Sequence, residues 1–133
     1  MAEHFDVRRP LPAIWAGSLL TVVLASLWPE GSWLDAVTKP ALWWSLGHAP
    51  AYALLTLLTL WMVAQRFPLT LGRLWWSAAG LSLLGILIEV LQPYFGRTAD
   101  VMDVVYNVIG ILLAVAIILY TRRRWPGAAH RAD

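Results

Sequence analysis

Residues 41–64 read ALWWSLGHAPAYALLTLLTLWMVA, and His48 is the only one of them that can be charged near neutral pH. A helix needs roughly 20 apolar residues to cross the hydrocarbon layer of a bilayer, and this run is long enough. A strand of a membrane β-barrel would alternate polar and apolar side chains, whereas the letters LLTLLTLW at positions 54–61 do not alternate. Because backbone groups in lipid must form their hydrogen bonds within the chain, the run predicts a membrane-spanning helix.

The composition of the whole chain agrees with a membrane protein. Its 133 residues are 59% hydrophobic and 14% charged, whereas soluble domains carry about 25% charged residues. A small soluble domain needs many polar residues to cover its surface, so lipid must cover part of this one. The net charge of +2 is too small to favour a nucleic-acid partner, and the absence of cysteine excludes disulfides.

Three more runs, on either side of the first, are nearly free of charged residues. The sequence therefore predicts an all-α integral membrane bundle of four transmembrane helices, at about residues 11–28, 41–64, 74–92 and 101–120. Arg8 and Arg9 precede the first run, as in a signal peptide. A signal core spans about 7–15 residues, however, and no small-residue cleavage site follows this run. We therefore expect a single domain over residues 1–133 that retains all four helices.

The distribution of lysine and arginine predicts how the bundle is oriented. Only Lys39 and Arg97 fall on one side of the predicted helices. The other eight basic residues fall on the opposite side: Arg8, Arg9, Arg66, Arg73, Arg122, Arg123, Arg124 and Arg131. Since cytoplasmic segments are enriched in Lys and Arg, we expect a multi-pass protein of the inner (cytoplasmic) membrane with both termini in the cytoplasm. The outer loops would then be residues 29–40 and 93–100, and residues 121–133 a basic cytoplasmic tail.

Polar side chains are concentrated near the predicted outer ends of the last three helices. Within each helix they share one face: His48 with Tyr52, Glu89 with Gln92, and Asp100 with Asp103, Asn107 and Gly110. Arg97 lies in the outer loop between the last two helices. Because polar groups inside a bilayer are costly, they usually face a bundle interior or a wet cavity and mark a functional site. The sequence thus predicts a polar pocket that opens to the extracytoplasmic side.

The last predicted helix has two further features. Val105, Ile109 and Leu112 lie opposite its polar stripe and are expected to face lipid. Gly110 and Ala114 form a pair of small residues four positions apart, a spacing that lets another helix approach closely.

Each polar residue also has a purely structural interpretation. Asp100 can cap the last helix, and Asp103 can favour the positive end of its dipole. Arg97 can pair with Glu89 or Asp103 as a structural ion pair. His48 can be a hydrogen-bonded histidine of the core. Considered together, so many costly groups at one level favour a functional site.

The order of these motifs resembles that of the VanZ-like membrane proteins. It reads HAPAY at positions 48–52, EVLQ at 89–92, GR at 96–97 and DVVYNVIG at 103–110. The resemblance covers roughly residues 34–114. It departs from the family at Ser45, where members often carry a lysine, and at Ala114, where a glycine is frequent. The family is named after a determinant of resistance to teicoplanin, so the resemblance implies a role at the cell envelope and in glycopeptide susceptibility, but no particular reaction.

We expect the pocket to bind the polar end of a membrane lipid or a lipid-linked envelope intermediate. In a first hypothesis the protein is an enzyme, with Glu89, His48 and Asp103 as catalytic candidates. The residues expected to bind the substrate are Arg97, Gln92, Asn107, Tyr52 and Asp100. Because the chain has no cysteine, and no serine lies beside the motifs, water or a substrate hydroxyl would be the nucleophile.

Two alternatives to an enzyme without a metal ion stay open. Asp100, Asp103 and Glu89 could together hold a divalent cation such as Mg²⁺ through oxygen ligands. In a second hypothesis the protein is a non-catalytic binding or scaffold partner of an envelope enzyme. A transporter half-unit ranks last, because four helices are few for that task and no inverted repeat occurs.

Overall fold

The computed structural model describes residues 10–29, 31 and 41–124, and over these residues the chain is helical and contains no strand. The elements are α1 (Leu11–Ser26), α3 (Ala41–Arg66), α4 (Leu71–Leu91), the short 3-10 helix η1 (Gln92–Phe95) and α5 (Val101–Arg124). The all-α class is therefore confirmed for the described residues. Most of the predicted loop 29–40, with Lys39, lies outside them, as do Arg8, Arg9 and Arg131.

Several helix boundaries differ from the sequence prediction: α1 ends at Ser26 rather than near residue 28, and α3 ends at Arg66 rather than near residue 64. The helix α4 begins at Leu71 rather than near residue 74, because Thr70 caps it: the Thr70 Oγ1 atom accepts the N–H of Arg73 at 3.3 Å. The helix α5 continues to Arg124, so the first four residues of the predicted tail 121–133 belong to the helix. The remainder of that tail lies outside the described residues.

Three segments are long and apolar enough to cross a membrane: Gly47–Arg66, Leu71–Phe95 and Val101–Arg123. They agree with the last three predicted spans. The helix α1 is also apolar, but its 16 residues make it about 24 Å long at 1.5 Å per residue. This is shorter than the hydrocarbon layer, which is roughly 30 Å thick. The structure therefore indicates a membrane protein with three helices of spanning length and a shorter apolar fourth.

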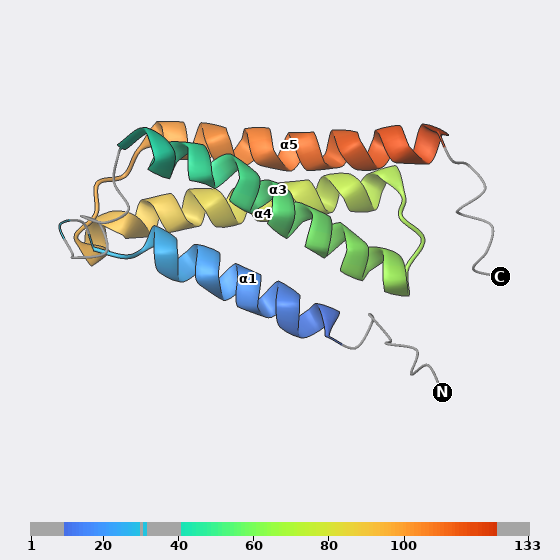
Figure 1. Ribbon diagram of the computed structural model, residues 1–133, viewed down its shortest axis with the longest axis horizontal. Coiled ribbons are helices and arrows are strands. Elements are labelled where there is room, and N and C mark those ends of the chain that lie inside the picture. The colour runs from blue at the N-terminus through green and yellow to red at the C-terminus, as the bar shows by residue number, and fades with distance from the viewer. Residues whose placement is uncertain (1–9, 30, 32–40, 125–133) are drawn as a thin grey trace.

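Successive helices run in opposite directions, as Figure 1 shows. One end of the bundle contains the end of α1, the start of α3 and the connection from α4 to α5; we call it the site end. The other end contains the turn of residues 67–70 between α3 and α4, together with the end of α5, and we call it the turn end. The segments that carry the polar motifs thus meet at one end of the molecule.

The helices α3, α4 and α5 enclose the core, and α1 packs mainly against α3. The buried cluster consists of Tyr52, Leu55, Leu60, Leu74, Ala78, Leu81, Ile111 and Val115. The predicted close approach at Gly110 is confirmed, because a Cβ atom there would overlap the backbone carbonyl of Ala49 in α3. On the opposite face of α5, Val105, Ile109 and Leu112 are exposed, as predicted for side chains that face lipid.

Candidate functional site

Seven of the eight predicted site residues are buried at the site end, although all have polar side chains. They are Tyr52, His48, Glu89, Gln92, Arg97, Asp103 and Asn107, each at most 9% exposed. The eighth residue, Asp100, is exposed. Three helices and one loop therefore bury polar groups at one end of the bundle, whereas side chains of these types are mostly exposed to water in soluble proteins.

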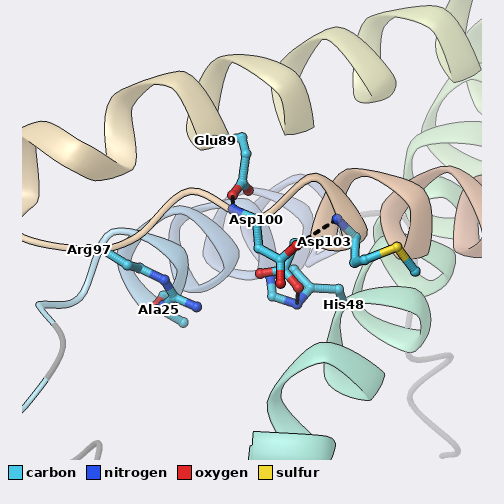
Figure 2. Close-up of polar contacts among 7 residues, drawn as sticks. Ala25, His48, Glu89, Arg97, Asp100 and Asp103 are labelled. Carbon is cyan, nitrogen blue, oxygen red and sulfur yellow. Dashed lines mark hydrogen bonds and ion pairs between the residues drawn. The ribbon is translucent and has the colours of Figure 1, made fainter.

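A contact between His48 and Asp103 joins α3 to α5. The Nδ1 atom of His48 lies 3.6 Å from the Oδ1 atom of Asp103, and Figure 2 shows the two side chains facing each other. A carboxylate beside one imidazole nitrogen fixes the orientation of the ring. His48 is thus a buried histidine with a carboxylate beside it, an arrangement compatible both with a structural contact and with acid–base chemistry.

Glu89 reaches across from α4 to the start of α5. Its Oε1 atom accepts the backbone N–H of Asp100, as Figure 2 shows. The Asp100 carboxylate in turn accepts the N–H of Met102 at 2.8 Å, so Asp100 caps α5 as its structural interpretation expected. In a common helix start, the acidic residue three positions into the helix bonds the capping residue's N–H. In α5 the third helical position is Asp103, but the Asp100 N–H is accepted by Glu89 of α4 instead.

Arg97 is positioned by the turn that ends η1. Gly96 has a φ of 73°, a backbone conformation that residues with a Cβ rarely adopt, and the N–H of Arg97 bonds the carbonyl of Gln92 at 3.2 Å. The Arg97 Nη1 atom donates to the carbonyl of Ala25 at the end of α1, at 3.4 Å. In a continuing helix the N–H of residue 29 would donate to this carbonyl, but residue 29 is a proline and has no N–H. Arg97 therefore ties α1 to the site end, a role that the sequence analysis did not foresee.

The charges of this end act on one another. Asp103, Arg97 and Asp100 all lie close enough to Glu89 to interact with it electrostatically. We refer to His48, Glu89 and Asp103, one residue from each of the three long helices, as the charged layer. Arg97 and Asp100 border this layer on the side of the loop, as Figure 2 shows.

A second set of residues lies one helical turn deeper on the same three helices. Four residues beyond His48 in α3 is Tyr52, four before Glu89 in α4 is Gly85, and four beyond Asp103 in α5 is Asn107. A Cβ atom on Gly85 would lie 3.0 Å from the Asn107 Nδ2 atom and 3.3 Å from the Tyr52 hydroxyl. Both groups therefore converge on the same point of α4. We call Tyr52, Gly85 and Asn107 the neutral layer.

Several polar atoms of these residues are buried without a hydrogen-bond partner. They include the Tyr52 hydroxyl, the Asn107 Oδ1 atom, the Asp103 Oδ1 atom and both amide atoms of Gln92. Leaving a buried polar atom unpaired costs about 1–3 kcal/mol. Such atoms are rare in folded proteins and are found where a water, an ion or a ligand completes the site. The arrangement thus offers hydrogen bonds to a small group or a water molecule bound among these helices.

The proposed set of metal ligands is not assembled. Among the described residues, no three His, Cys, Asp or Glu side chains are placed so that they could hold one metal ion. The carboxylates are instead turned to different partners: Glu89 to the Asp100 N–H, Asp100 to the Met102 N–H, and Asp103 to His48. The geometry therefore does not support a magnesium site built from Glu89, Asp100 and Asp103.

Sequence reasoning overlooked two participants. Gly85 has no polar side chain, but it lies one turn from Glu89 on the same face of an otherwise apolar helix, and this spacing could have identified it. The carbonyl of Ala25 could have been found from Pro29, which removes its usual donor.

No known family model, curated protein or solved structure matches the chain.

Proposed function

We propose that the chain is a VanZ-like multi-pass protein of the inner membrane that holds the polar part of a lipid-linked cell-envelope component at its site end. One observation carries this proposal: three helices bury charged and polar side chains at one end of an apolar bundle, and some of their polar atoms lack partners. In a membrane protein such groups mark binding or transport sites. A family role in teicoplanin susceptibility fits a site that meets the outer leaflet.

The orientation in this proposal places the turn end in the cytoplasm. Arg66 and Arg73 flank the turn of residues 67–70, and Arg122 and Arg123 lie near the end of α5. Among the described residues, Arg97 is the only Lys or Arg at the site end. This asymmetry supports cytoplasmic termini, a site end on the extracytoplasmic side and, with α1 included, four membrane passes.

Labelling with a maleimide that cannot cross the membrane tests this orientation without background, because the chain has no cysteine. Tyr94→Cys introduces a thiol at an exposed position of the site end, and Gln65→Cys introduces one at the turn end. We expect intact cells to label the first variant, and the second to react only after permeabilisation. The reverse pattern would contradict the orientation and place the site on the cytoplasmic face.

Catalysis is a second candidate, favoured by the His48–Asp103 pair. A carboxylate that orients an imidazole is the usual support of a histidine acting as general base or acid. In this function His48 would move a proton at the reacting group of the bound lipid, while Asp103 holds the ring and Glu89 lies beside it. The binding function needs the same residues but no turnover.

The envelope lipids of cells that express the wild type or Glu89→Gln would distinguish the two functions. Glutamine keeps an oxygen that can accept the Asp100 N–H, so the variant removes the charge but preserves the link between α4 and α5. Lipids are compared by mass spectrometry at matched membrane levels of the two proteins, with Thr70→Ala at the turn end as a control. A lipid changed covalently only by the wild type would establish an enzyme.

Two other results are informative. Identical lipid profiles, together with teicoplanin tolerance that Glu89→Gln loses and Thr70→Ala keeps, would establish the binding role. If neither the lipids nor the tolerance differs between the wild type, Glu89→Gln and cells without the protein, the proposed function is wrong.

A further inference from the structure

The neutral layer carries an inference about which part of a lipid the site takes; it rests on the proposed function and makes it more specific. Tyr52, Gly85 and Asn107 are separated from the charged layer by one helical turn, about 6 Å along each helix axis. They lie between the charged layer and the apolar core formed by residues such as Leu81 and Ile111.

The hydrogen-bonding atoms of the neutral layer are uncharged. The Tyr52 hydroxyl can donate and accept, and the Asn107 Oδ1 atom accepts only. Tyr52 is 1% exposed and Asn107 is 3% exposed, and neither of these atoms has a partner. A hydroxyl group satisfies such a set, because it donates to the amide oxygen and accepts from the phenol. An ionised phosphodiester satisfies the set only in part, because it can accept from the phenol but offers no proton to the amide oxygen.

The ionisable side chains of the site end also favour an uncharged ligand group. At the site end, the described residues include three carboxylates, those of Glu89, Asp100 and Asp103, against Arg97 and His48. Even with His48 protonated, the carboxylates are in excess. An anion would be repelled by this excess, and like charges at short distance in a medium of low dielectric constant are strongly unfavourable. Arg97, the group best suited to an anion, is directed to the end of α1.

Gly85 sets the size of the group. A Cβ atom added to Gly85 would lie 3.0 Å from the Asn107 Nδ2 atom and 3.3 Å from the Tyr52 hydroxyl, so the two side chains pack closely against the backbone of α4. Groups packed this closely can be reached by one small group such as a hydroxyl but not by a whole sugar ring, so the ring would lie outside the neutral layer.

We infer that the neutral layer is a subsite for an uncharged hydroxyl of the headgroup, so that the ligand is a glycolipid or other polyol lipid bound through its hydroxyls rather than through a phosphate. The charged layer then receives the remaining hydroxyls, which can donate to Glu89 and Asp103. Neutral hydrogen bonds of this kind contribute about 0.5–1.5 kcal/mol each.

The test uses the full chain in phosphatidylcholine nanodiscs that contain one of two probe lipids with identical acyl chains. Glucosyldiacylglycerol is neutral and carries hydroxyls, whereas phosphatidylethanol is anionic and its headgroup ends in an ethyl group. Native mass spectrometry measures how much of each probe stays bound to the protein. We expect the wild type to retain the glucolipid about tenfold better, the effect of two neutral hydrogen bonds.

Variants locate this preference in the neutral layer. Tyr52→Phe and Asn107→Leu each remove the hydrogen-bonding atoms with little change in size, and each should lower glucolipid retention about threefold to tenfold. Retention of phosphatidylethanol should not change. The matched control is Thr56→Val, one turn below Tyr52, because the Thr56 hydroxyl already donates to the Tyr52 carbonyl at 2.6 Å. It should behave as the wild type.

Each other outcome overturns the inference. If both probes are retained equally and above phosphatidylcholine, the hydroxyl subsite is wrong while binding of a polar headgroup stands. If the glucolipid is preferred but Tyr52→Phe and Asn107→Leu behave as the wild type, the neutral layer is not the subsite and holds at most water. If neither probe is retained above phosphatidylcholine, the inference and the proposed function both fail.

Discussion

The two ends of the bundle hold their polar groups in different ways. At the turn end, Arg73 bonds Thr70 through its N–H and the Pro68 carbonyl through its side chain, partners three and five residues away. At the site end, the Asp100 N–H bonds Glu89 across 11 residues, and Arg97 reaches the Ala25 carbonyl across 72. The Arg73 bonds at the turn end stay within one turn, whereas the Glu89 and Arg97 side chains at the site end find partners on other helices.

This difference explains why only one end can form a site. A local turn satisfies its donors close to water, where a polar group costs little to leave exposed. At the site end the same types of group are brought inside by separate helices, and their bonds exist only when the helices are in place. We therefore expect perturbations at the site end to affect the whole fold, and equivalent perturbations at the turn end to stay local.

The largest effect is expected where α3 and α5 touch. Gly110→Ala introduces a Cβ atom into the backbone of Ala49, which has no flexible part that could move aside, so we expect a loss of about 3 kcal/mol in the free energy of unfolding. Gly80→Ala is the control, because nothing lies within 4 Å of its added Cβ atom. It should be neutral or stabilise by up to about 1 kcal/mol. Unfolding in detergent micelles, followed by circular dichroism, measures both, and equal stability of the two variants would contradict the close contact.

The next effect compares the two helix starts directly. Glu89→Ala removes the acceptor of the Asp100 N–H and with it this hydrogen bond between α4 and α5. We expect the free energy of unfolding to fall by about 2 kcal/mol. Thr70→Ala removes a cap that lies within its own turn and should cost about 1 kcal/mol. The same unfolding measurement applies. A larger loss for Thr70→Ala would show that the cap provided by α4 contributes no more than a local one.

A smaller effect separates the two arginines. Arg97→Gln weakens the bond to the end of α1, so we expect the amides of Leu27 and Trp28 to exchange hydrogen about fivefold faster, which corresponds to about 1 kcal/mol. Arg73→Gln, at the turn end, should leave that exchange unchanged and cost less than about 0.5 kcal/mol. Unchanged exchange in Arg97→Gln would mean that other contacts hold α1 in place.

The smallest effect concerns the packing of α1 on α3. The indole N–H of Trp15 donates to the Thr59 hydroxyl at 2.9 Å, and Thr59 also donates to the Leu55 carbonyl. Hydrogen bonds between membrane helices contribute about 0.6 kcal/mol on average, so Trp15→Phe and Thr59→Val should show a coupling of that size in a double-mutant cycle. Additive losses would indicate that the contact is apolar packing alone.

Much of the candidate site could be predicted from the sequence because helical periodicity is regular. Spacings of three and four residues place His48 with Tyr52 and Asp103 with Asn107 on single faces, and the structure buries all four. The same reasoning identified Gly110 as a contact position. Asp100 is different: its spacing places it on the stripe with Asp103, but α5 begins at Val101, as predicted, so Asp100 precedes the helix and caps it as an exposed residue.

The sequence by itself determined the helices, their apolar faces and the residues that gather at one end, since these follow from hydropathy and a repeat of 3.6 residues per turn. Only the tertiary structure decided which groups meet: that Glu89 accepts the N–H at the start of α5, that Arg97 bonds the end of α1, and that Tyr52 and Asn107 converge on Gly85. The physical reason is that periodicity assigns a face to each residue but does not set the rotation and depth of one helix against another. Those are set by packing, above all by the contact of Gly110 with Ala49.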